Sequence, residues 1–69
     1  MSNKTYKVIE LIGSSPNSWE EAARGVVEKA SSTLHDLRVA EISHMDMKID
    51  GGKILEFRVK VKLSFKYDD

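Results

Sequence analysis

The sequence predicts an α+β fold in which a curved, three-stranded antiparallel sheet wraps around one helix. Apolar and polar residues alternate strictly through residues 55–67, which is typical of a long strand. A helical stripe of apolar residues follows the loop "GSSPNS" at residues 13–18. The turn "DGG" at residues 50–52 lies between two strand-like segments and indicates a hairpin. The predicted order is therefore β-α-β-β, in a single domain that covers residues 1–69.

The first strand is predicted at about residues 5–12. The segment "YKVIELI" is rich in the β-branched and aromatic side chains that favour strands, and it ends at Gly13. The loop that follows consists of residues that favour turns. Its glycine and serines do not have the spacing of a phosphate-binding loop, so we interpret it as a strand-to-helix turn.

The helix is predicted at about residues 18–34. Ser18 can cap it, and Glu21, three residues later, can return a hydrogen bond to the Ser18 backbone. Gly25 costs a helix about 1 kcal/mol relative to alanine, so we expect it to permit a tight contact. Trp19 is expected to anchor the core or an interface. The apolar stripe, whose alanines predict close packing on a sheet, consists of Trp19, Ala22, Ala23, Val26, Val27, Ala30 and Leu34.

The two remaining strands are predicted at about residues 37–49 and 53–67. The apolar positions of the first of these change phase twice, which predicts β-bulges or a sharp bend. In the hairpin we expect Ile49 to pair with Leu55, and Met47 to pair with Phe57. The apolar face of the last strand is Leu55, Phe57, Val59, Val61, Leu63, Phe65 and Tyr67.

The lengths of these elements predict an oligomer. Residues 55–67 span roughly 40 Å at about 3.3 Å per residue, whereas residues 19–34 span about 24 Å as a helix. One helix therefore cannot cover the hairpin, and a second copy of the chain is the expected partner. A chain of 69 residues without cysteine has few other means of stabilising a small core.

Charge and composition argue against several classes of protein. Eleven basic and eleven acidic residues balance, whereas nucleic-acid binders usually carry a basic excess. No apolar run approaches the ~20 residues that cross a bilayer, and no signal-peptide core follows Met1, so we expect a cytoplasmic protein. Lys60, Lys62 and Lys66 are interpreted as the solvated face of a strand, with anion binding as the alternative.

No catalytic constellation is evident, so we expect a protein that is not an enzyme. His35 and His44 have no partner at metal or triad spacing, and general acid–base catalysis needs a positioned set of groups. Asp46 and Asp50 do not have the spacing of an EF-hand loop. They are interpreted as a solvated face, or as candidate ligands of a calcium site assembled between subunits.

Three segments resemble the dodecins over nearly the whole chain. They are "YKVIELIGSSPNSWEEAA", "STLHDLRVAEI" and "EFRVKVKLSFKY". The resemblance implies a β-α-β-β subunit and a hollow shell of twelve copies. It also implies a storage or protective role, without enzymatic activity, in which flavins bind in pairs at two-fold axes between subunits.

The resemblance also identifies two positions at which this sequence departs from the flavin-binding pattern. Arg38 stands where a tryptophan stacks on the flavin ring, and Arg58 stands where a glutamine hydrogen-bonds the polar edge of that ring. In this respect the sequence resembles a subgroup described as calcium dodecins, which also have arginine at the tryptophan position. We expect Arg38 to lie opposite about residue 66, roughly 26 Å from Arg58 along the last strand. Within one chain the two arginines are then too far apart to share a ligand, whereas arginines of two subunits related by a symmetry axis could share one.

The expected function is a homododecameric binding or storage protein. It holds a flavin-type or anionic small molecule, or a cation such as calcium, between subunits, and its flavin binding is weakened by Arg38 and Arg58. The alternative is a purely structural assembly that has lost the flavin pocket.

Overall fold

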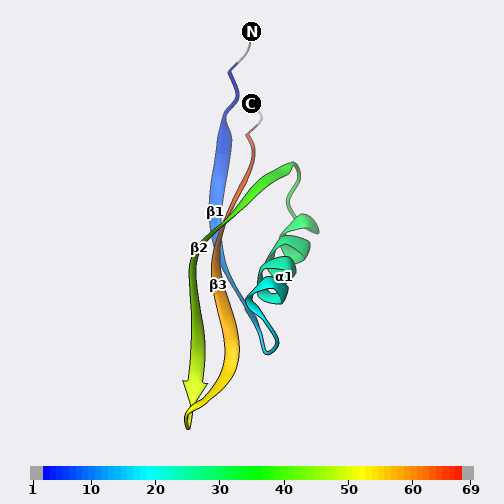
Figure 1. Ribbon diagram of the computed structural model, residues 1–69. Coiled ribbons are helices and arrows are strands. Elements are labelled where there is room, and N and C mark those ends of the chain that lie inside the picture. Colours follow the sequence, from blue (N-terminus) through cyan, green and yellow to red (C-terminus); the bar gives the residue numbers. More distant parts are fainter. Residues whose placement is uncertain (1–2, 68–69) are drawn as a thin grey trace.

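The structure is a computed structural model that describes residues 3–67. Its elements are β1 (Tyr6–Ser15), α1 (Trp19–Ser31), β2 (Leu37–Asp50) and β3 (Lys53–Lys66). The strands form one antiparallel sheet in the order β1-β3-β2, and α1 lies beside it (Figure 1). The predicted β-α-β-β order is confirmed. The strand β1 ends at Ser15, three residues after its predicted end at residue 12. The helix α1 ends at Ser31, three residues before its predicted end at residue 34.

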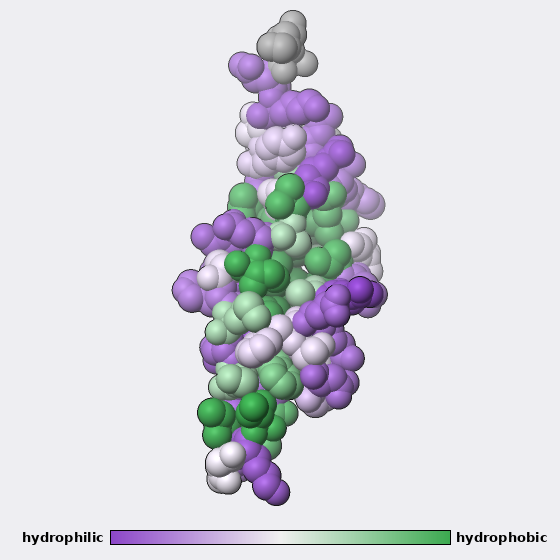
Figure 2. Space-filling view, viewed as in Figure 1, coloured by the Kyte–Doolittle hydropathy of each residue, from purple (hydrophilic) through white to green (hydrophobic). Residues whose placement is uncertain are grey.

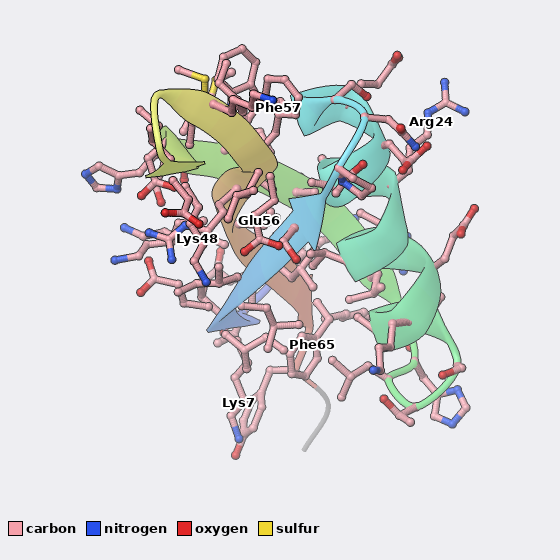
Figure 3. All side chains as sticks on the ribbon, turned by 90° about the horizontal axis from the view of Figure 1, so that it is seen from below. Lys7, Arg24, Lys48, Glu56, Phe57 and Phe65 are labelled. Carbon is pink, nitrogen blue, oxygen red and sulfur yellow. The ribbon has the colours of Figure 1, made fainter. Side chains whose placement is uncertain are left out.

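The core lies between α1 and the central strand β3. Alternate residues of β3 point toward the helix, where small side chains allow the helix to approach closely. The buried residues of this core are Ala22, Val26 and Ala30 from α1, with Val59, Val61 and Leu63 from β3. Phe57 and Phe65 extend the same face of β3 toward the two ends of the helix, and Arg24 points away from the sheet (Figure 3). The predicted apolar face of the last strand is therefore the face that packs on the helix.

The glycine that permits close packing of helix and sheet is Gly13, not Gly25. A Cβ atom at residue 13 would overlap Cγ2 of Val26 and lie 2.7 Å from the carbonyl oxygen of Ala22. A Cβ atom at Gly25 would meet nothing within 4 Å, because this residue lies on the exposed side of α1. The prediction for Gly25 was wrong, since a glycine in a helical stripe does not reveal which way it faces.

The turn into α1 is held by a network around Ser15. Ser18 accepts a hydrogen bond from the Glu21 N–H at 3.0 Å, as predicted for a helix cap. The Glu21 carboxylate does not close the expected box but accepts bonds from the Ser15 hydroxyl and from Nδ2 of Asn17. The buried Ser15 Oγ in turn accepts the N–H groups of Asn17, at 3.0 Å, and Ser18, at 3.3 Å. These bonds, that from Ser15 above all, hold the pKa of Glu21 below its ordinary value.

Three register shifts shape β2. They lie between Leu37 and Val39, between Ile42 and His44, and between Lys48 and Ile49. The first two account for the predicted changes of phase. The third lies at the end of the hairpin, where β-bulges are common and where the sequence showed no change of phase.

The shifts correct two predicted pairings. Ile49 pairs with Ile54 rather than with Leu55, although the pairing of Met47 with Phe57 is confirmed. Arg38 has no direct partner near residue 66, because Leu37 pairs with Phe65 and Val39 pairs with Ser64. Arg38 is therefore the extra residue of a bulge.

The β2–β3 hairpin extends well beyond the helix (Figure 1). The molecule measures 56 × 20 × 14 Å, and apolar side chains gather at the hairpin end as well as over the middle (Figure 2). Ile49 is 61% exposed and Met45 is 55% exposed, and Ile54 and Leu55 are exposed in the same region. The predicted excess of uncovered apolar surface is therefore present in one subunit. Among residues 3–67, no helix is long and apolar enough to cross a membrane.

Candidate functional site

Two of the predicted site residues, Asp46 and Arg58, bind each other. They are direct partners across β2 and β3. Nε of Arg58 donates to Oδ1 of Asp46 at 2.7 Å, and Nη2 donates to Oδ2 at 2.9 Å. This bidentate bond lowers the pKa of the Asp46 carboxyl group and raises the pKa of the Arg58 guanidinium group. The two side chains are 56% and 44% exposed, so a ligand or a second subunit can reach the pair.

The bulge at Ser43 decides which side chains of β2 join this pair. Before it, Ile42 pairs with Val61 on the face toward the helix, and after it Met45 pairs with Val59 on the same face. His44 and Asp46 therefore point to the opposite face, which we call the outer face. Ser43 Oγ donates to the carbonyl oxygen of Lys60 at 3.2 Å and fixes the bulge against β3.

Trp19 supports the same position from the helix side. Its indole Nε1 donates to the carbonyl oxygen of Asp46 at 3.0 Å. Its ring meets the Phe57 ring edge to face, with centroids 5.0 Å apart. The expected role of Trp19 in the core is thus confirmed, because it packs against the core cluster. Its link to Asp46 was missed, since nothing in the sequence relates residues 27 positions apart.

A hollow of about 240 Å³ opens beside the Asp46–Arg58 pair. Its remaining side-chain walls include His44, Lys60 and Ile12, which come from β2, β3 and β1. Lys60 pairs with His44 on one side and with Ile12 on the other. Sequence reasoning placed Lys60 on a solvated strand face but did not bring His44 beside it, because that requires the register of β2.

Arg38 lies far from this hollow. Its Nη2 is 3.9 Å from Oδ1 of Asp36, and both side chains are half exposed. Arg58 and Phe65, the partner of Leu37, are seven positions apart on β3, which corresponds to roughly 23 Å. One subunit therefore keeps Arg38 and Arg58 apart, in agreement with the separation expected from the sequence.

Asp50 is also separate from Asp46. It pairs with Lys53 at the hairpin turn, where Gly51 and Gly52 have positive φ angles of 57° and 77°. Within residues 3–67, no three His, Cys, Asp or Glu side chains are grouped so as to hold a metal ion. Calcium prefers about six to eight oxygen ligands, and Asp46 and Asp50 contribute separate carboxylates on one hairpin.

Comparison with known proteins places this geometry in a family. The family model described as Dodecin matches residues 5–68. The chain belongs to the dodecin family. The solved dodecin from Streptomyces coelicolor is similar to it with a TM-score of 0.91 and 36% identity, and the match covers 100% of this chain and 99% of that one.

Two further relatives bear on ligands. The "calcium dodecin" of Mycobacterium tuberculosis is 44% identical over 88% of this chain and 86% of its own. A crystal structure of calcium dodecin from that organism, described as having a novel calcium-binding site, matches with a TM-score of 0.81 and 46% identity. That match covers 93% of this chain and 91% of that one. The dodecin of Thermus thermophilus is 27% identical over 96% of both chains.

Arg58 differs chemically from the glutamine that the family resemblance implies at this position. Glutamine offers a donor and an acceptor, whereas Arg58 has donors only. Two of its N–H groups are already bound by Asp46. The guanidinium plane is therefore oriented by β2, and it offers no acceptor to an N–H group of a ligand.

Proposed function

We propose that this dodecin is a non-enzymatic, homododecameric binding protein that holds its ligand between subunits. The observation that carries the proposal is the apolar surface of the β2–β3 hairpin, which α1 leaves uncovered. Exposed apolar surface of this kind marks an interaction site. Family membership supports a shell of like subunits as the partner, and packing the hairpins together brings the candidate ligand residues of different chains into reach of each other.

Flavin is expected to bind weakly. An arginine can still lie flat on a flavin ring, with a cation–π attraction of about 0.5–2 kcal/mol, so Arg38 alone does not prevent stacking. Arg58 has the larger effect on flavin binding, because the imide N–H of the flavin then faces a donor instead of an acceptor. A buried donor left without an acceptor costs about 1–3 kcal/mol. A loss of about 1.4 kcal/mol already weakens binding tenfold, and we expect at least that difference from dodecins that have tryptophan and glutamine.

A riboflavin fluorescence titration tests this expectation. The unmodified protein should quench riboflavin only at high concentration, and the double variant Arg38→Trp with Arg58→Gln should bind at least about tenfold more tightly. Each single variant should restore part of the affinity. Tight quenching by the unmodified protein would contradict the weak-binding proposal while leaving the assembly intact.

Calcium is the second candidate ligand, because a relative 44% identical to this chain is a calcium dodecin. Asp46 and Asp50 are the proposed ligands from this chain. The Asp46 oxygens keep lone pairs beyond those that accept from Arg58, so the ion pair does not by itself exclude a cation. The competing proposal is a structural shell without a ligand, which the mutual satisfaction of Asp46 and Arg58 within one subunit favours.

A further inference from the structure

We propose that the hollow on the outer face of the sheet is a phosphate-binding site, in which Lys60, His44 and Arg58 hold the anion. The proposal rests on the binding role proposed above and adds the chemistry of the ligand. The ligand class is inorganic phosphate or the phosphate group of a small monoester. The carrying observation is the convergence of three potential cations from two strands on one cavity of about 240 Å³.

Lys60 is the centre of this site. It lies between Ile12 of β1 and His44 of β2, so neither cross-strand neighbour is acidic. Among the residues that the structure describes, Lys60 takes part in no ion pair. Its side chain is half-buried, and an ammonium group in that setting gains from an anionic partner.

The next lysine on the same face shows how different this environment is. Lys62 lies between Glu10 of β1 and Glu41 of β2, so acidic side chains flank it on both sides. The net charge of the chain is zero, but acidic and basic side chains are not evenly mixed along β3: Lys62 has acidic neighbours and Lys60 does not. Of the described residues that line the hollow, Asp46 is the one acidic residue, and Arg58, Lys60 and His44 line the hollow with it.

The bulge at Ser43 creates the site. Without the extra residue, the alternation of β2 would turn His44 toward the helix and Ser43 outward. The hydrogen bond from Ser43 to the Lys60 carbonyl holds the bulged conformation at the same position along β3 as the central lysine. Bulges that re-aim a side chain in this way are common beside functional sites.

A phosphate group suits the donors better than a planar carboxylate does. Arg58 has five N–H donors, of which Asp46 occupies two, and the ammonium of Lys60 has three. These donors and His44 approach from two strands, which matches the several oxygens of a tetrahedral anion. Ile12, which is 65% exposed, forms an apolar wall for the carbon atoms of a small ester.

Equilibrium dialysis with radiolabelled inorganic phosphate tests the site in the full-length assembled protein. Lys60→Gln should weaken binding at least about tenfold, and His44→Gln should weaken it less. Lys62→Gln is the matched control on the same strand and face, and it should change binding by less than about twofold. Asp46→Asn should strengthen phosphate binding, because it releases Arg58 and removes a negative charge. The same change should weaken calcium binding.

Competition by glycerol 3-phosphate distinguishes the two sources of the phosphate group. If the ligand is a monoester, glycerol 3-phosphate should bind more tightly than inorganic phosphate. In Ile12→Ser the two compounds should then bind with equal affinity. Equal binding of both compounds indicates a site for the free ion. Absence of phosphate binding, or equal losses in Lys60→Gln and Lys62→Gln, would overturn the inference. Light scattering on the same samples separates that result from a failure of assembly.

Discussion

Asp46 and Arg58 show how a single contact changes the interpretation of a site. The sequence and the family resemblance suggested Arg58 for a flavin or an anion and Asp46 for a cation. In the structure each is the other's partner, through two hydrogen bonds of 2.7 and 2.9 Å. A ligand at this position must therefore either accept the pair as it stands or compete with one half of it.

Calcium calorimetry on chelator-treated protein tests the cation side of this competition. Heat of binding should appear in the unmodified protein and decrease in both Asp46→Asn and Asp50→Asn, because each change removes a carboxylate ligand. Asp36→Asn is the control, since Asp36 lies beside Arg38 and away from both candidates. Absence of heat in the unmodified protein would end the calcium proposal.

Glu21 makes the turn into α1 sensitive to acid. Its pKa is lower in the folded protein than in the unfolded chain, so its contribution to stability is full above its ordinary pKa. That contribution is lost as the pH falls through the lowered value, because protonation then disrupts the bonds from Ser15 and Asn17. Thermal unfolding of Glu21→Gln should therefore depend less on pH than that of the unmodified protein between about pH 5 and 3. Glu20→Gln, in the same first turn but paired with Arg24 at the surface, should keep the full dependence.

The contact between helix and sheet depends on the backbone of β1 at Gly13. Gly13→Ala should destabilise the fold by about 1–3 kcal/mol, because the new methyl group overlaps Val26 and the carbonyl of Ala22. Gly25→Ala is the matched control in α1, where open space and helix propensity predict a gain of about 1 kcal/mol. Denaturant unfolding of both variants measures the difference. Equal effects would show that close packing at Gly13 has no role.

The elements themselves could be predicted because their patterns are local. Alternation in residues 55–67, a helical stripe and a "DGG" turn each specify one element, and two of the three register shifts of β2 appear in the sequence as changes of phase. Contacts between distant residues could not be predicted. The Trp19–Asp46 bond, the meeting of His44 with Lys60 and the packing of α1 on Gly13 depend on a register and a crossing that no single segment encodes.

The whole molecule is long and thin, and this shape is the physical basis of the proposed assembly. Its core is small, with six buried apolar residues between α1 and β3 among the described residues, whereas the hairpin exposes apolar side chains far from the helix. The helix α1 is about 20 Å long and covers less than half of β3, which spans about 46 Å. The remaining surface is the one that a second subunit must cover, and the candidate ligand residues Asp46, Asp50 and Arg58 belong to the same hairpin.

Light scattering coupled to size-exclusion chromatography measures the mass of the native particle and so tests the proposed homododecamer. We expect one compact species of about 94 kDa, twelve times the 7.8 kDa of one chain, at micromolar concentration. Replacing the exposed Met45 and Ile49 by aspartate should shift the protein to smaller species, because charges then lie on the surface that the subunits bury. A stable monomer or dimer of the unmodified chain would contradict the assembly and, with it, a ligand site between subunits.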